Sequence, residues 1–260
     1  MVVFFDIDGT LVDDATQIIP ESTVRAISQL RRNGHIPIVN TGRPYNHIDP
    51  RVRNLDFCGL VCGCGMQIQL EGEWLVQVGP TLEQCRMIRD LARRCNMQVL
   101  YESEYGELHL DGDYSTHPAI REECYWMEKK GFRIVRLDED QPRFLKLVTF
   151  DGPGCRREEF IQGVAPVYDC IDRGNTMLEL VMRGCSKAIG IEKIMDHLGI
   201  SPEEALAIGD STNDLPMFSM AGHTVCMGNG MEELKQKAEF ITDTVLNDGI
   251  EKALRHYGLI

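Results

Sequence analysis

The sequence predicts an α/β protein in which a mostly parallel sheet forms the core and a smaller α+β domain is inserted. Near both ends of the chain, apolar runs with the length of buried strands alternate with segments of helical periodicity, a pattern typical of parallel sheets. From about residue 80 the pattern changes to short segments of alternating polar and apolar residues. The length of 260 residues allows a large core together with a second domain.

The first part of the chain predicts a β-α-β arrangement. Val24, Ile27 and Leu30 recur at helical spacing, and Asn33-Gly34 is typical of a helix end. Alternating residues around Glu71-Gly72-Glu73 indicate a hairpin. The expected elements are a strand at 2–5, a helix at 22–32, strands at 35–40 and 60–64, and a hairpin at 66–78.

The middle part predicts the inserted domain, after which the core pattern resumes. Met87, Ile88, Leu91 and Cys95 would share one face of a helix at 82–95. The other elements expected in the insertion are strands at 99–102, 106–110, 144–150, 167–171 and 177–182, a helix near 120–130, and a helix after residue 154. The core then continues with a helix at 187–197, a strand at 205–208, a loop at 209–214 and short strand–helix units to residue 257.

Charge and composition disfavour several classes of protein. With 27 basic and 40 acidic residues the net charge is -13, which opposes binding to nucleic acid or anionic membranes. No segment approaches the ~18 apolar residues of a membrane span, and the first residues lack the pattern of a signal peptide. Ten scattered cysteines favour a reducing cytoplasm. The cluster of Cys58, Cys62 and Cys64 is expected to be buried thiols rather than a metal site.

Two acids directly follow the first predicted strand. Asp6 and Asp8 are separated by one residue and precede Gly9-Thr10. Ligands bind at the carboxyl ends of strands in open α/β sheets, and two adjacent carboxylates repel each other unless a cation or a shared proton compensates. The sequence therefore predicts a metal site here. Gly9 would allow a sharp turn, and Thr10 offers a hydroxyl group to the same pocket.

Three further polar groups are expected at the same edge of the sheet. They are the turn 40–44 (NTGRP), Lys187 at a predicted helix start, and the loop 209–214 (GDSTND). Together these groups suit phosphoryl transfer, because Mg²⁺ prefers one or two carboxylates with water and phosphate oxygens. Asp6 and Asp210 would supply the carboxylates, and a carboxylate can also act as nucleophile. Asp8 is suited to general acid–base catalysis. The groups suited to hold phosphoryl oxygens are Thr41, Gly42, Lys187 and Asn213.

In these motifs the chain resembles the haloacid dehalogenase (HAD) superfamily phosphatases, of the Cof-type subgroup with a C2B cap. The matching motifs are DIDGT (6–10), NTGRP (40–44), SKAIGI (186–191) and GDSTNDLPM (209–217). The resemblance implies a HAD-like Rossmannoid core at 1–80 and 184–260 and a cap at 81–183. It also implies that Asp6 is the nucleophile and Asp8 the general acid/base. The metal ligands would be Asp6, the Asp8 backbone carbonyl and Asp210, with Thr10, Arg43 and Asp214 in support.

The function expected from these residues is Mg²⁺-dependent hydrolysis of a small phosphorylated metabolite through an aspartyl-phosphate intermediate. A sugar phosphate is the first expectation for the substrate, and a phosphorylated cofactor such as PLP or FMN is the second. Two alternatives stay open: a phosphomutase of the phosphomannomutase type, and a non-catalytic ligand sensor with this fold. The chain departs from the family pattern at Cys62-Gly63-Cys64-Gly65, where an Asn-Gly pair is usual.

Overall fold

The computed structural model describes residues 1–260 and divides them into two compact units. Unit 1 comprises Met1–Gly42, Ile48–Gln77 and Ser186–Ile260, and unit 2 comprises Arg43–His47 and Val78–Cys185. The segment 81–183, for which the sequence predicts a cap, lies within unit 2. Residues 43–47, which the sequence analysis placed in the core, group with unit 2 as well.

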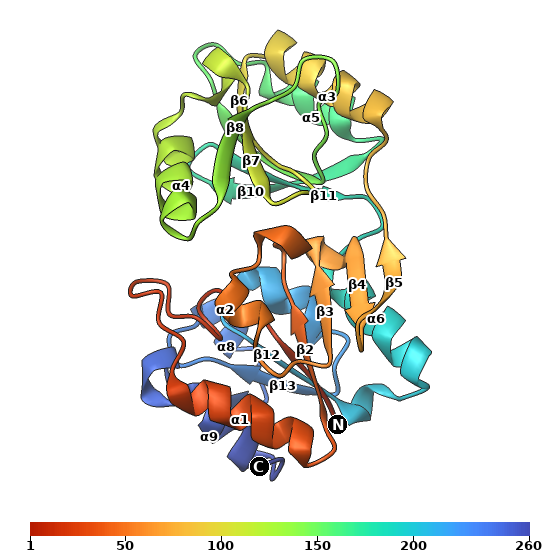
Figure 1. Cartoon of the computed structure of the whole chain (residues 1–260), viewed down its shortest axis with the longest axis vertical. Helices are drawn as coiled ribbons and strands as arrows, with labels where there is room; N and C mark the ends of the chain where they lie inside the picture. Colours follow the sequence, from red (N-terminus) through yellow and green to blue (C-terminus); the bar gives the residue numbers. More distant parts are fainter. The chain divides into compact units, whose positions relative to one another are not determined.

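Unit 1 is built on one eight-stranded sheet (Figure 1). Its strands are β1 (Val2–Phe5), β2 (Ile36–Asn40), β3 (Gly59–Cys62), β4 (Gln67–Leu70), β5 (Glu73–Gln77), β12 (Ala205–Gly209), β13 (His223–Cys226) and β14 (Phe240–Ile241). The strand order is β14-β13-β12-β1-β2-β3-β4-β5. Neighbours from β14 to β3 are parallel, whereas β4 and β5 form an antiparallel hairpin. The predicted α/β fold with a parallel-sheet core is therefore confirmed.

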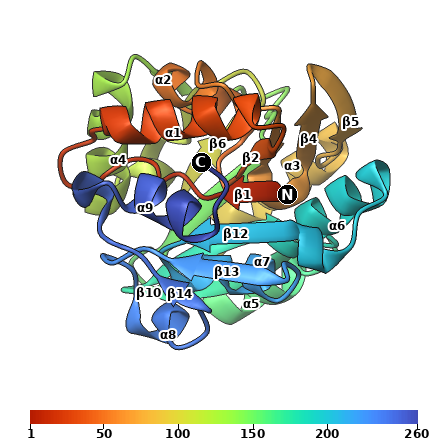
Figure 2. The same ribbon diagram turned by 90° about the horizontal axis from the view of Figure 1, so that it is seen from below.

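Helices cover both faces of this sheet. They are α1 (Glu21–Arg32), α2 (Pro50–Arg53), α6 (Lys187–Leu198), α7 (Leu215–Phe218), α8 (Glu232–Lys235) and α9 (Gly249–His256). On one face, α6, α7 and α8 pack in a single apolar cluster with β1 and β2. Helices α1 and α9 contact each other along the opposite face (Figure 2). Ile27 and Leu30 of α1 are fully buried, whereas Val24 is 39% exposed.

The parallel register brings three strand ends to one edge of the sheet. Phe5 at the end of β1 is paired with Val39 in β2 and with Ile208 in β12. Residues that directly follow these strands therefore emerge side by side. The predicted strand at 60–64 ends earlier, at Cys62, because Gly63–Gly65 forms a 3₁₀ turn with Cys64 at a φ of 57°.

Unit 2 contains a six-stranded sheet with helices on both faces. Its elements are α3 (Leu82–Arg94), β6 (Met97–Glu102), β7 (Glu107–Leu110), α4 (Pro118–Lys129), β8 (Arg133–Arg136), β9 (Lys146–Asp151), α5 (Arg157–Val164), β10 (Tyr168–Gly174) and β11 (Met177–Met182). The strand order is β10-β11-β9-β6-β7-β8, and only β7 and β8 are parallel. Helices α3 and α5 pack on one face and α4 on the other.

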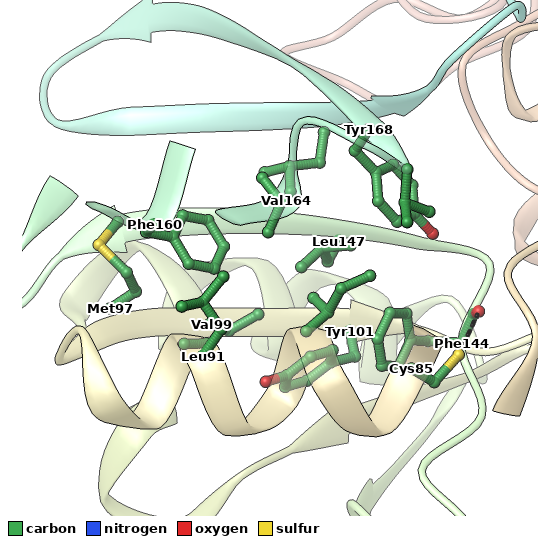
Figure 3. Close-up of a cluster of buried hydrophobic side chains, with 14 of the residues drawn as sticks. Cys85, Leu91, Met97, Val99, Tyr101, Phe144, Leu147, Phe160, Val164 and Tyr168 are labelled. Atoms are coloured by element: carbon green, nitrogen blue, oxygen red, sulfur yellow. Dashed lines mark hydrogen bonds between the residues drawn. The ribbon is translucent and has the colours of Figure 1, made fainter. Parts of the chain in front are cut away.

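The larger apolar cluster of unit 2 lies between its sheet and helices α3 and α5 (Figure 3). Tyr101 and Phe144 pack with ring centroids 4.8 Å apart. The Tyr168 hydroxyl donates to the Leu145 carbonyl oxygen at 2.7 Å, which satisfies its polar end inside the core. Met87 is 38% exposed, so the prediction that it lies on the buried face of α3 was wrong.

All ten cysteines are free thiols, and Cys58 and Cys62 are buried. Burial raises the pKa of the Cys58 thiol to about 11, so it stays protonated and packs as a small apolar group. Among the helices, none combines the length and the apolar character needed to cross a lipid bilayer.

Candidate active site

Asp6 and Asp8 lie in a tight turn at the carboxyl end of β1. The Asp6 N–H continues the sheet by donating to the Ile208 carbonyl oxygen at 3.0 Å, and the Gly9 N–H donates to the Val12 carbonyl oxygen at 2.8 Å. Gly9 has a φ of 73°, and a Cβ built there would lie 2.4 Å from an Asp210 carboxylate oxygen. Only glycine therefore permits this turn to approach Asp210 so closely.

Three carboxylates gather beside this turn. Oxygens of Asp6, Asp210 and Asp214 lie within 4.8 Å of one another. Burial and the neighbouring Asp214 raise the pKa of Asp6 well above its ordinary value. The same causes, in the same order, raise the pKa of Asp210 to about 7. Burial and mutual repulsion therefore disfavour the charged forms of both acids, and a nearby cation favours them.

The donor set fits a hard divalent cation. Carboxylate oxygens are the protein ligands that Mg²⁺ prefers, and a cation would offset the repulsion that raises the pKa of Asp6 and Asp210. The cluster contains Asp6 and Asp210, which the sequence predicted as ligands, and also Asp214, which it placed in a supporting role.

Lys187 reaches the acid cluster from the first turn of α6. Its Nζ donates to Asp6 Oδ1 at 2.7 Å, to Asp214 Oδ1 at 2.5 Å and to Asn213 Oδ1 at 3.3 Å. The side chain is only 2% exposed. Burial alone would lower the pKa of Lys187, but Asp214 and Asp6 together raise it above its ordinary value. The ammonium group is therefore charged and shared between two carboxylates.

Asp214 also organises the loop that carries Asp210. Its Oδ2 accepts hydrogen bonds from the backbone N–H groups of Asp210, at 3.0 Å, and Ser211, at 3.2 Å. Thr10, which the sequence predicted as a supporting residue, donates its hydroxyl hydrogen to Asp210 Oδ1 at 3.2 Å. One Asp210 oxygen thus accepts a hydrogen bond from Thr10 in the turn after β1. Asp214 fixes the backbone of the loop that carries both acids.

The other predicted site residues divide between the two units. Thr41 is buried at the end of β2, and its N–H donates to the Val61 carbonyl oxygen at 2.8 Å. Gly42 is the last residue of the first segment of unit 1. Arg43 belongs to unit 2, where its Nη1 lies 3.9 Å from Met127 Sδ.

Two asparagines also contact this site: Asn40, which the sequence placed in the turn 40–44 without a role of its own, and Asn229, which sequence reasoning missed. Asn40 Nδ2 donates to the Lys187 carbonyl oxygen at 2.9 Å. Asn229 Nδ2 donates to the Gly9 carbonyl oxygen at 2.7 Å, and its Oδ1 accepts the N–H of Val245 at 3.1 Å. Asn40 is the polar end of an otherwise apolar strand, whereas no pattern in the sequence singles out Asn229.

Buried acids at the strand ends of an α/β core, with a lysine that reaches them from a helix, suit metal-assisted hydrolysis. The sequence matches the haloacid dehalogenase-like hydrolase family over residues 3–254, and the chain belongs to this family. The resemblance seen in the four motifs is thereby confirmed, as is the expectation of a hydrolase of the phosphatase type.

Similar proteins match along the whole chain. YkrA of Bacillus subtilis (strain 168) is 28% identical over 260 residues, covering 100% of this chain and 98% of YkrA. The 5-amino-6-(5-phospho-D-ribitylamino)uracil phosphatase YcsE of the same organism is 28% identical over 260 residues, covering 99% and 96%. The solved structure of the HAD subclass IIB sugar phosphatase BT4131 has a TM-score of 0.78 at 25% identity, covering 100% of this chain and 99% of that chain.

Proposed function

We propose that this protein is a Mg²⁺-dependent phosphomonoesterase that acts on a small phosphorylated metabolite in the cytoplasm. The observation that carries the proposal is the buried Asp6 carboxylate, which lies at a strand end in an acid cluster and is bonded to Lys187. Such a carboxylate can attack phosphorus once neighbouring positive charge offsets repulsion from the substrate. When bound, Mg²⁺ would neutralise charge on the transferring phosphoryl group.

Each residue of the site has a proposed role in this reaction. Asp6 attacks the phosphorus atom and forms an aspartyl phosphate, and Asp8 protonates the leaving oxygen and then activates the attacking water. The Mg²⁺ ligands are Asp6, Asp210 and the Asp8 backbone carbonyl, with Asp214 and Thr10 in support. The groups that hold phosphoryl oxygens are Thr41, Gly42, Lys187 and Asn213. Asn213 suits this role, because Lys187 and Ser211 both donate to its amide oxygen. These bonds orient the amide so that its NH₂ group is the part that can donate to a phosphoryl oxygen.

The substrate proposed first is a sugar or sugar-alcohol phosphate, and a phosphorylated cofactor is second. Two similar proteins support this order. BT4131 is a sugar phosphatase, and the compound named for YcsE carries its phosphate on a ribityl chain. Residues 81–183 of unit 2 would act as the cap that selects the leaving group, with Arg43 in a supporting role.

A panel of phosphate esters tests this proposal. We expect the purified protein to release inorganic phosphate from hexose and pentitol monophosphates with Mg²⁺, and to lose this activity when the metal is chelated. Isomerised hexose phosphate without free phosphate would show a mutase instead. No turnover of any ester in the panel would overturn the proposal.

A further inference from the structure

Asn40 presents an unusual buried amide. It is the last residue of β2 and is fully shielded from solvent. Its NH₂ group donates to the Lys187 carbonyl oxygen, whereas its Oδ1 has no hydrogen-bond partner. An unbonded buried acceptor is destabilising, and an apolar side chain of the same shape avoids that cost but loses the bond to Lys187. The unbonded oxygen thus offsets what the hydrogen bond to Lys187 contributes to stability, so stability alone does not account for the amide.

The contact of Asn40 is with the backbone of the residue whose side chain enters the acid cluster. Lys187 is the first residue of α6, and its Nζ bridges Asp6 and Asp214. A lysine side chain has four flexible bonds and loses much rotamer freedom when held in one place. Fixing its backbone limits the positions that the ammonium group can reach. A hydrogen bond from β2 to this carbonyl provides such a restraint.

The start of α6 is also held on the side of β3. A Cβ at Gly190 would lie 2.3 Å from Val61 Cγ1, so the helix approaches the strand as closely as glycine allows. A Cβ at Gly65 would lie 3.0 Å from the Ser186 carbonyl oxygen. These contacts are steric and limit how near the helix can come. The Asn40 hydrogen bond is directional and sets where the first turn lies along the end of β2.

We infer that Asn40 is a positioning residue that holds the first turn of α6 so that Lys187 bridges Asp6 and Asp214. The inference rests on the proposed function, in which Lys187 stabilises the transferring phosphoryl group. A displacement of ~1 Å in such a group can lower the rate by ~10²-fold.

The test replaces Asn40 with a side chain of similar shape and no hydrogen-bonding groups. We expect Asn40→Leu to lower kcat at least ~10-fold while the variant stays folded under the assay conditions, as denaturant unfolding and circular dichroism measure. KM should change by less than ~3-fold, because the lost interaction belongs mainly to the transition state. Asn40→Ala, which adds no volume, serves as a second variant in the same assays.

The matched control is Thr242→Val, which also removes a buried side-chain donor to a backbone carbonyl. Thr242 Oγ1 donates to the Gly249 carbonyl oxygen at 2.7 Å, and the residue is 7% exposed. We expect this variant to lose stability but keep the wild-type kcat. Wild-type kcat in both Asn40 variants would overturn the inference. So would a loss of kcat in Asn40→Leu that only follows its unfolded fraction.

A second measurement tests the position of Lys187 without depending on enzyme activity. The rate at which a small acylating reagent labels the Lys187 amine is measured by peptide mass spectrometry, with Lys193 of the same helix as reference. We expect labelling of Lys187 to be several-fold faster in Asn40→Leu than in wild type, because the amine leaves its buried ion pairs. An unchanged rate would overturn the inference. If the wild type hydrolyses no phosphate ester, the proposed function fails, and the labelling still decides the role of Asn40.

Discussion

Asp6 is a buried carboxylate that contacts the charged Lys187 at 2.7 Å. As the proposed nucleophile and metal ligand, it has no substitute in the site. We expect Asp6→Asn to lower turnover by at least ~10³-fold and to leave the circular dichroism spectrum unchanged. The amide has nearly the same shape and retains an oxygen for Lys187. A burst of phosphoenzyme formation in this variant would show that another residue is the nucleophile.

Asp8 is proposed as the general acid and base, so its substitution should separate formation of the phosphoenzyme from its hydrolysis. We expect Asp8→Asn to lower kcat for alkyl phosphates by ~10²–10⁴-fold, the usual effect of losing a general acid–base group. With 4-nitrophenyl phosphate, whose leaving group needs no protonation, phosphoenzyme should form and then accumulate. Rapid-quench trapping measures this species. Equal kcat values for variant and wild type would remove Asp8 from the mechanism.

The sequence indicates some neighbours in the site but not others. Asp6 and Asp210 each follow an apolar strand, and parallel strands end at the same edge, so their proximity could be predicted. The contact of Asn40 with Lys187 joins positions 147 residues apart. No periodicity encodes it, because it depends on how closely α6 approaches β2. The roles assigned to these residues stay predictions.

At the scale of elements, periodicity located the helices well and their exact buried faces less well. Helix α3 spans Leu82–Arg94, close to the predicted 82–95, since Thr81 forms a capping box with Gln84 at its start. Val24 and Met87 are exposed because each lies at the margin of an apolar stripe. At the margin the neighbouring element, rather than the spacing, decides burial.

The packing of α6 against β3 gives a prediction of its own. Alanine is favoured over glycine in a helix by ~1 kcal/mol, but here its Cβ would lie 2.3 Å from Val61 Cγ1. Overpacking of this kind costs ~1–3 kcal/mol, so the clash outweighs the propensity. We expect Gly190→Ala to be destabilised in denaturant unfolding and to lose activity, because Lys187 is one turn away.

Val61→Ala provides the matching partner in a double-mutant cycle. Removing the Val61 methyl groups makes room for the new Cβ, so the double variant should be more stable than the sum of the single changes implies. Additive effects of the two substitutions would mean that the clash is relieved elsewhere, and that α6 is less tightly held than its contacts indicate.

At the scale of the whole molecule, the net charge of -13 attracts cations to many surface acids. Cation binding therefore identifies the proposed site only where it depends on the residues of that site. The buried acids can be distinguished from surface acids by the pH at which they lose their protons. In the metal-free protein the pKa of Asp210 is raised to about 7, from an ordinary value of 3.8. Between these values the folded protein binds more protons at Asp210 than the unfolded chain does. The stabilisation that comes from protonated Asp210 is therefore complete below pH 4 and is lost as the pH rises toward 7.

Mg²⁺ should reverse this trend, because it binds the deprotonated carboxylates. We expect a saturating Mg²⁺ concentration of ~100 times Kd to stabilise the protein by ~2.7 kcal/mol at pH 8, and much less at pH 5, where protons occupy the site. Differential scanning calorimetry with and without the metal measures both effects. In Asp210→Asn the pH-dependent loss of stability and the Mg²⁺ effect should both shrink, whereas weak binding to surface acids would persist. Equal stabilisation by Mg²⁺ in this variant and the wild type would place the metal elsewhere on the acidic surface and separate the Asp6–Asp210–Asp214 cluster from metal binding.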